Sequence, residues 1–426
     1  MTGAWATLFI LLAIYVTSYI DRQAMGIVVE FIKTDLSLSD TNIGFLQGFI
    51  FTTILVVFSI PLSWFVDNYN RRRMLTLCVS LFALATIGCG LAHSFAELAI
   101  ARGGLALAEA IVPAAAMSLI GDVFPRQRVG SAIAIFLSGG TIGSGLAFMG
   151  GGAALAALDR FAGYDMPLIG KFEPWRGLFI LLGTMTLLLA LVTAFWLREP
   201  SRQQDGEDSV GWATVGSLMR QKGTYITYFI IFAAALAMTG YSLYAWSAAM
   251  LIRVHQLSTF TTGMIVGPMF VVASLVGAAV SAWSSARAGA NHALRQVLKT
   301  MVWAVAGMFP LFVALPYMNA VWAAVVLCGL LLLYAIANVS FLTPVQLITP
   351  PRLRGRMTAV VSTMCVIPAG LGPVLVGMVT DRVIHDPAGL DKALSWVLSS
   401  VLLIGVAGGV AAYRQARIIE EAPKGA

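Results

Sequence analysis

The chain has 426 residues, of which 59% are hydrophobic and 11% are charged, and its mean hydropathy is +0.85. Globular domains carry about 25% charged residues, so this composition excludes an ordinary soluble protein and predicts a polytopic helical membrane protein. The net charge of +7 is the excess of Lys and Arg that membrane proteins hold in their cytoplasmic loops. We therefore expect no nucleic-acid partner.

Apolar stretches long enough to cross a bilayer, about 20 residues each, follow one another along the chain. They lie near residues 5–32, 41–66, 73–93, 95–121, 129–156, 175–197, 223–252, 260–286, 292–315, 319–347, 356–381 and 393–414. The sequence thus predicts an all-α membrane protein of twelve transmembrane helices. It divides into an N-terminal six-helix bundle at 1–197, a cytoplasmic linker at 198–222 and a C-terminal six-helix bundle at 223–426.

The distribution of basic residues predicts the orientation. If the N-terminus is cytoplasmic, most of the 27 Lys and Arg residues fall in cytoplasmic loops or in the C-terminal tail, among them Arg71, Arg126 and Arg354. Loops with an excess of Lys and Arg stay on the cytoplasmic side. We expect a multi-pass protein of the cell (inner or plasma) membrane with both termini in the cytoplasm.

The two halves resemble each other around their fifth helices. Residues 125–128 read PRQR and residues 351–354 read PRLR, and each run leads into a helix rich in small residues, at 139–145 and at 370–377. Small residues let membrane helices approach closely. Two interpretations remain open, simple helix packing and a sliding surface between two rocking halves. The repeat itself predicts pseudo-two-fold symmetry, which is typical of a transporter.

Four ionisable residues lie deep within predicted helices. Asp21 and Arg22 are adjacent in the first helix, while Arg102 and Glu109 lie seven residues apart, on one face of the fourth. A charge near the bilayer centre costs about 3 kcal/mol or more. We therefore expect the two acids and two arginines to form one neutral cluster between these helices.

This cluster has two interpretations. It can simply lock two helices together, as buried ion networks do in soluble proteins, or it can bind protons and substrate, because burial raises the pKa of a carboxyl group and a neighbouring arginine lowers it. Of the two candidate proton carriers, Glu109 is favoured over Asp21, which adjoins Arg22. Pro113 also cannot donate the helix bond to the Glu109 carbonyl. Arg22 and Arg102 are candidate contacts for an anionic substrate.

The stretch 63–73, SWFVDNYNRRR, connects the second and third helices. It resembles the G-x-x-x-D-R-x-G-R-[RK] signature of the major facilitator superfamily, although polar residues replace its glycines and its first arginine. The resemblance implies that Asp67 meets the N-terminus of the eleventh helix, where negative charge is favoured, and that Arg71 pairs with Asp122 to close a cytoplasmic gate. The other arginines of the run need no role beyond the positive-inside rule.

Other stretches of the first half resemble the spinster branch of the same superfamily. They are Tyr19-Ile20-Asp21-Arg22, Ala101-Arg102-Gly103-Gly104, Ala108-Glu109-Ala110, Gly121-Asp122-Val123-Phe124-Pro125, Gly143-Ser144-Gly145-Leu146 and Trp175-Arg176. The second half shares the architecture rather than the motifs. The resemblance, to a bacterial member with short loops, implies the major facilitator fold and a lysolipid or sphingosine-1-phosphate-like substrate.

The sequence as a whole predicts a secondary active, proton-coupled, alternating-access transporter of amphipathic anionic lipids. The alternatives are a proton-coupled carrier of a small organic anion or drug, and a non-transporting lipid sensor. Tyr241, Asn338 and Thr343 are the candidate substrate contacts of the second half. An enzyme is not expected, and neither is a cofactor or a metal site. The expected partners are the lipid-like substrate, protons and membrane lipids, and the expected state is a monomer.

Overall fold

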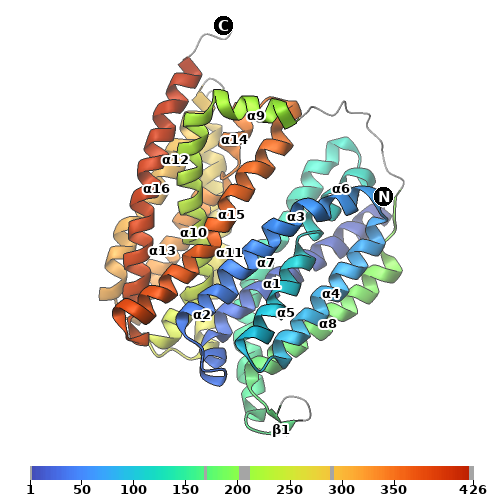
Figure 1. Cartoon of the computed structure of the whole chain (residues 1–426), viewed down its shortest axis with the longest axis vertical. Coiled ribbons are helices and arrows are strands. Elements are labelled where there is room, and N and C mark those ends of the chain that lie inside the picture. The colour runs from blue at the N-terminus through green and yellow to red at the C-terminus, as the bar shows by residue number, and fades with distance from the viewer. Residues whose placement is uncertain (1, 167–169, 201–211, 288–291, 422–426) are drawn as a thin grey trace. The chain divides into compact units, whose positions relative to one another are not determined.

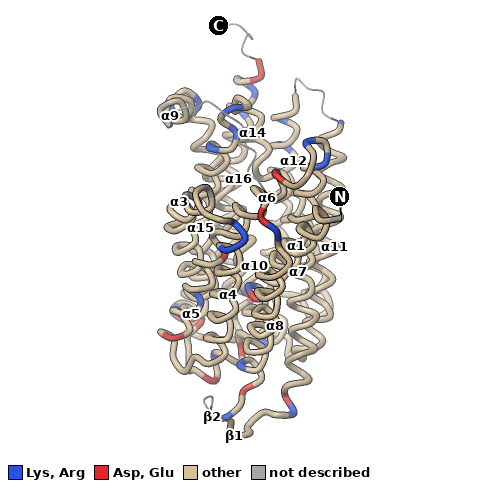
Figure 2. The backbone as a smooth tube through the Cα atoms, turned by 90° about the vertical axis from the view of Figure 1, so that its right-hand side faces the viewer, with Lys and Arg blue, Asp and Glu red and all other residues tan. Residues whose placement is uncertain are grey.

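The computed structural model describes residues 2–166, 170–200, 212–287 and 292–421. Within these ranges it contains twelve helical segments that are long and apolar enough to cross a membrane, so the protein is an all-α, multi-pass membrane protein. Charged residues gather near the ends of the helices, and most of the backbone between them is uncharged (Figure 2). Within these ranges, the structure does not describe the side chains of seven residues: Thr2, Ile60, Ser63, Trp64, Asp67, Trp212 and Ala213.

The helices of the first half, which Figure 1 labels, have bounds within a few residues of the predicted spans. A short hairpin of two strands lies in the loop before the sixth span. The elements are α1 (Thr2–Asp35), α2 (Asp40–Gly44), the π-helical turn η1 (Phe45–Phe49), α3 (Ile50–Asn68), α4 (Arg71–Leu91), α5 (Phe95–Glu109), α6 (Val112–Val123), α7 (Arg126–Leu158), η2 (Asp159–Phe161), β1 (Asp165–Met166), β2 (Gly170–Lys171) and α8 (Pro174–Trp196).

The second half adds one helix that the sequence did not predict, α9 (Trp212–Gln221), within the expected linker. The rest of that linker at 201–211 lies outside the described residues. The other elements are α10 (Gly223–Arg253), α11 (Thr259–Ala286), α12 (Ala293–Ala314), η4 (Leu315–Tyr317), α13 (Ala320–Val339), α14 (Thr343–Ile348), η5 (Pro351–Leu353), α15 (Arg354–Val379), η6 (Thr380–Ile384), η7 (Pro387–Gly389) and α16 (Leu390–Glu421).

These elements form two compact units. Unit 1 comprises Met1–Asp205 and Ala245–Val271, and unit 2 comprises Gly206–Tyr244 and Val272–Ala426. Helices α10 and α11 therefore each contribute to both units. The division into bundles at 1–197 and 223–426 stays a prediction.

Local sequence signals explain where several helices begin. Asn70 precedes α4, and its side chain accepts a hydrogen bond from the Arg73 backbone N–H at 2.9 Å. Ser94 caps α5 in the same way by accepting from Glu97 N. Such caps satisfy backbone donors that have no partner within the helix. The Asn70 cap fixes Arg71 as the first residue of α4.

Two predicted helices are interrupted. The span expected at 95–121 breaks between Glu109, where α5 ends, and Val112, where α6 begins; the span expected at 319–347 breaks between α13 and α14. A proline sits in the first turn after each break, Pro113 and Pro344. Proline has no N–H to continue the preceding helix. The same interruption in the fourth and tenth spans is a further sign of the internal repeat.

Glycines allow close helix contacts at corresponding places in the two halves. In unit 1, a Cβ added to Gly143 of α7 would lie 2.5 Å from the carbonyl oxygen of Val16 in α1. In unit 2, a Cβ added to Gly372 of α15 would lie 2.5 Å from the carbonyl oxygen of Met238 in α10. The small residues therefore serve helix packing in both units. A sliding motion at these contacts stays a prediction.

We expect Gly143→Ala to lower the melting temperature of the purified protein, because the new methyl group overlaps backbone that cannot rotate away. Overpacking of this kind costs about 1–3 kcal/mol. Gly150, on the same helix, is the matched control, since an added Cβ there meets nothing within 4 Å and alanine favours a helix over glycine. Equal melting temperatures for the two variants would contradict this account of α7.

Candidate functional site

The predicted four-charge cluster lies between α1 and α5. Arg22 Nη1 is 3.3 Å from Glu109 Oε1, and Arg102 Nη1 is 3.9 Å from Asp21 Oδ1. Each residue thus has an ion-pair partner on the other helix. The structure brings together the four residues that the sequence singled out, as two crossed ion pairs.

The two pairs differ in burial. Asp21 and Arg102 are each 1% exposed, whereas the side chain of Arg22 is 18% exposed and that of Glu109 is 7% exposed. The Asp21–Arg102 pair is therefore sealed inside unit 1. The Arg22–Glu109 pair is the one that a ligand or a proton reaches more easily.

Asp21 has a further partner that sequence reasoning missed. The hydroxyl of Thr86, on α4, donates to the Asp21 carboxylate. The same hydroxyl also lies 3.0 Å from its own helix's Phe82 carbonyl. A threonine in an apolar helix usually bonds to its own backbone, so nothing in the sequence distinguished Thr86 from the others.

The cluster keeps hydrogen-bonding capacity. Among the described residues, Asp21 Oδ1, Arg102 Nε and Glu109 Oε2 are buried and have no hydrogen-bond partner. A buried polar atom without a partner costs about 1–3 kcal/mol, and buried networks that serve only stability are normally satisfied. The arrangement therefore suits groups that take up a proton or a polar ligand atom.

Aromatic rings line the cluster. The guanidinium carbon of Arg22 lies 4.5 Å from the ring centroid of Phe51 and 5.7 Å from that of Tyr19, and the guanidinium carbon of Arg102 lies 5.7 Å from Phe51. These distances fall within the range of cation–π attraction. Phe51 thus contacts both arginines, and the site combines positive charge with apolar surface.

The three candidate contacts of the second half belong to unit 2. Tyr241 is half-buried in α10, Asn338 is exposed in the last turn of α13, and Thr343 begins α14. Asn338 and Thr343 therefore flank the break in the tenth span. Their role in substrate binding stays a prediction.

The predicted gate residue Arg71 joins several segments of unit 1. It donates to the carboxylate of Asp122, to Ser118 Oγ at 2.8 Å and to Glu199 Oε1 at 2.9 Å. The Arg71–Asp122 pair is the one that the family resemblance implied, while Glu199 lies outside the motif and was missed. The side chain of Asp67 lies outside the described residues, so its predicted contact with the eleventh helix stays a prediction.

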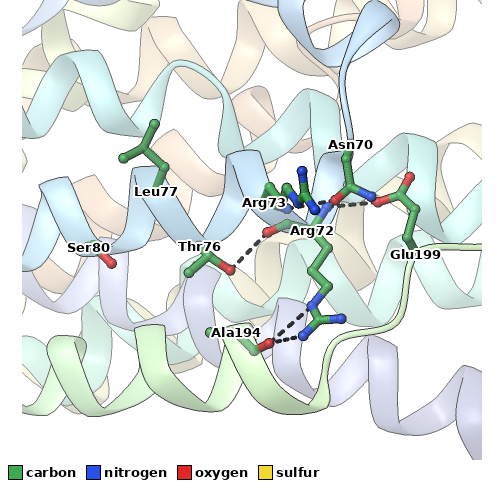
Figure 3. A pocket seen from close by; sticks show the side chains of 8 residues that line it. All are labelled: Asn70, Arg72, Arg73, Thr76, Leu77, Ser80, Ala194 and Glu199. Carbon is green, nitrogen blue, oxygen red and sulfur yellow. Dashed lines mark hydrogen bonds between the residues drawn. The ribbon is translucent and has the colours of Figure 1, made fainter.

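A surface pocket of about 540 Å³ is lined in part by Glu199, where the start of α4 meets the end of α8 (Figure 3). Glu199 accepts from the backbone N–H of Arg72 at 2.8 Å, and the Arg72 side chain donates to the carbonyl of Ala194. Glu199 therefore receives hydrogen bonds from two consecutive residues of α4. Arg72, to which the sequence assigned only the positive-inside rule, ties α4 to α8.

A second charge network joins the C-terminal end of α1 to α2 and α10, within unit 1. Arg253 donates to Glu30 Oε1 at 2.7 Å and to both carboxylate oxygens of Asp40 at 2.7 and 2.9 Å. Lys33 Nζ lies 2.7 Å from Asp40, which is fully buried. Bidentate arginine pairs are strong and geometrically specific. This network was not predicted from the sequence, because only charged residues deep within the helices were considered.

The Trp175-Arg176 motif has a structural use. Arg176 donates to Asp35 Oδ2 at 2.9 Å and to the carbonyl of Ala92 at 2.6 Å, and Trp175 Nε1 donates to the same Asp35 oxygen at 3.1 Å. The start of α8 is thereby fastened to the end of α1 and to the loop after α4. These bonds hold the helices that carry the charge cluster and the Arg253 network.

Repeated apolar spans and a buried charge cluster are typical of a membrane transporter. The family model of the Major Facilitator Superfamily matches residues 11–373. The chain belongs to the Major Facilitator Superfamily, and its fold is that of the family's transporters.

Solved structures and known sequences agree with this assignment. A bacterial homologue of the human lysosomal transporter spinster, in an inward-facing and unoccupied conformation, has a TM-score of 0.79 and 24% identity over 99% of each chain; this likeness shows the fold. An MFS-type efflux pump of Mycolicibacterium smegmatis is 26% identical over 98% of this chain and 95% of the pump.

Protein spinster homolog 1 of Rattus norvegicus is 25% identical over 58% of this chain. That match spans 46% of the length of the rat protein. With the structural neighbour, it confirms the resemblance to a bacterial spinster homologue predicted from the sequence.

We expect Thr86→Val to destabilise the protein by about 1–3 kcal/mol, because it leaves a buried carboxylate oxygen without its donor. Thr86→Ser keeps the hydroxyl and should retain most of the stability. Thr193 is the matched control: it is equally buried, and its hydroxyl donates to the carbonyl of Leu189 in its own helix. Melting curves that fall equally for Thr86→Val and Thr193→Val would rule out the bond to Asp21 as the cause.

Proposed function

We propose that this chain is a proton-coupled, alternating-access transporter of amphipathic anionic lipids, such as lysophospholipids or sphingosine-1-phosphate-like molecules. The observation that carries this proposal is the crossed pairing of two arginines with two carboxylates beside an aromatic wall. A guanidinium released from its carboxylate binds phosphate in a bidentate manner. The neighbouring rings offer apolar surface to the start of a hydrocarbon chain.

In the proposed cycle Glu109 is the proton carrier, and Asp21 stays charged. The side chain of Asp21 is held by both Arg102 and Thr86, whereas the Glu109 carboxylate pairs with Arg22. Protonation of Glu109 removes the charge that holds Arg22. The released guanidinium then binds the anionic head group, and Tyr241, Asn338 and Thr343 contribute contacts from the second half.

Alternating access requires a gate on each side of the substrate site. We assign the cytoplasmic gate to Asp67, Arg71 and Asp122, with Glu199 as an additional partner. The opposite gate is the Arg253–Asp40 network. The two bundles at 1–197 and 223–426, joined by a linker at 198–222, move about the site in the cell membrane, with both termini in the cytoplasm.

A second candidate function is a proton-coupled carrier of a small organic anion or drug. The similarity to an efflux pump over nearly its full length favours this alternative. In that case the same arginines bind a soluble anion, and no acyl chain is required. A non-transporting lipid sensor is a third reading, which flux measurements separate from the other two.

The proposed function is tested with purified protein in liposomes, by measuring the pH-gradient-driven flux of a lysophospholipid and of soluble organic anions. We expect lysophospholipid flux, and a higher melting temperature with lysophospholipid than with the soluble anions. Flux of the soluble anions alone would establish the second candidate. Binding of lysophospholipid without any flux would identify a sensor.

In the same liposomes, Glu109→Gln should abolish the dependence of flux on the pH gradient, because glutamine neither gains nor loses a proton. Glu97→Gln is the matched control, since Glu97 lies on the same helix, is exposed and bonds to the backbone of His93. Full pH dependence in Glu109→Gln would refute the role of Glu109 while leaving lipid transport itself intact.

Arg253→Gln should open the gate formed by the second charge network, because Asp40 and Glu30 lose their shared counter-charge. The reporter is Ala248→Cys, a fully buried position in α10, in a chain without Cys78, Cys89, Cys328 and Cys365. Its thiol should react faster with a membrane-impermeant reagent when Arg253→Gln is present. Arg160→Gln, at an exposed arginine, should leave the rate unchanged. An unchanged rate in Arg253→Gln would show that the network is no gate.

A further inference from the structure

A groove of about 360 Å³ lies on unit 2 between α12 and α16, which pack together (Figure 1). Lys299 and Tyr413 line it together with the apolar residues Ala306 and Val406, and Val302, Trp303 and Val410 complete its walls. Its lining includes no residue of the four-charge cluster, of the Arg71 contacts or of the Arg253 network. The proposed transport function therefore leaves it unexplained.

The pairing of the two helices orders these residues along the groove. The backbone N–H of Leu294 donates to Glu420 at 3.1 Å, and an added Cβ on Gly409 would meet Val302 at 2.7 Å. The helices are thus antiparallel, which places Tyr413 opposite Lys299 and Val406 opposite Ala306. Seven residues of helix span about 10 Å. The groove therefore runs about 10 Å from a polar end to an apolar end.

The polar end keeps a positive charge. Arg295 pairs with Glu420 at 2.9 Å, and Arg417 pairs with Glu421 at 2.9 Å. Lys299 is exposed and has no ion pair among the described residues. A lysine side chain near a helix start extends towards the membrane surface. The Lys299 ammonium group therefore lies near the membrane surface, at the level of the lipid phosphate groups.

The remaining walls suit the membrane. Trp303 is 69% exposed, and α12 belongs to a span long and apolar enough to cross a bilayer. Trp303 lies ten residues after the start of α12, about 15 Å along the helix, so its exposed ring reaches the level of the acyl chains. We propose that the groove binds one anionic glycerophospholipid of the surrounding bilayer. Its phosphate lies against Lys299 and Tyr413, and one acyl chain lies along Val302, Ala306 and Val406.

The head group, rather than the chain, determines which lipid binds. Lipid tails are as apolar as the groove walls, so moving a chain from bilayer to groove gains little. A basic residue near the membrane surface contributes about a five-fold gain in affinity for an anionic lipid. We therefore expect phosphatidylglycerol to bind about five-fold more tightly than phosphatidylcholine, and Lys299 to account for the difference.

Trp303 provides the readout. The full-length protein in an uncharged detergent is titrated with phosphatidylglycerol or phosphatidylcholine carrying bromine on the acyl chains, which quenches tryptophan fluorescence on contact. The part due to Trp303 is the difference between the native chain and Trp303→Phe. We expect half-quenching at about five-fold lower phosphatidylglycerol concentration, and Lys299→Gln should remove this preference. Ala306→Phe, which fills the apolar end, should weaken quenching by both lipids.

Lys392→Gln is the matched control, because Lys392 is an exposed lysine at the other end of α16, and it should keep the preference. Equal quenching by the two lipids in the native chain would overturn the proposal, as would a preference that survives Lys299→Gln. The readout is binding without transport. A negative result would therefore leave the proposed function untouched.

Discussion

The burial of four charges between α1 and α5 is the constraint on which the rest of unit 1 depends. Because each unpaired charge would cost about 3 kcal/mol or more in the bilayer, the two helices must approach with their arginines and carboxylates in register. Close packing of α1 against α7 at Gly143 and the bond from Thr86 to Asp21 fix that register. The neighbouring helices thus serve to place the charges.

The helix break after Glu109 links the repeat to the site. The fourth span ends its first segment at the residue that pairs with Arg22, and the tenth span breaks between Asn338 and Thr343. A break leaves backbone carbonyl groups without intrahelical partners, which membrane proteins tolerate only where the backbone is buried in protein or lines a cavity. At both breaks, therefore, the helix is interrupted next to residues that are candidate ligand contacts.

The twelve membrane-spanning segments could be predicted from the sequence, because apolar length determines where a chain crosses a bilayer, whereas α9 and the two helix breaks could not. The charge cluster was predictable because a buried charge needs an opposite charge nearby. The sequence places only a few charged residues deep within its helices, so the possible partners were few. The choice of partner for Asp21 was not predictable, since it depends on helix rotation. The Arg253–Asp40 network was not predicted because charged residues are common at the ends of membrane helices. Thr86 was not predicted because threonine hydroxyls are common within helices and usually bond to their own backbone.

Burial and the number of partners distinguish ion pairs that can exchange partners from ion pairs that stay fixed. Asp21 and Arg102 are almost fully buried, and separating them would leave both charges stranded, a cost of about 3–5 kcal/mol. Asp40 differs because it has two cationic partners: when Arg253 leaves, Lys33 still neutralises it. Arg22, which is partly exposed, can exchange its carboxylate for solvent or ligand. In the proposed cycle the Arg253 network and the Arg22–Glu109 pair therefore rearrange, while the Asp21–Arg102 pair stays as the anchor between α1 and α5.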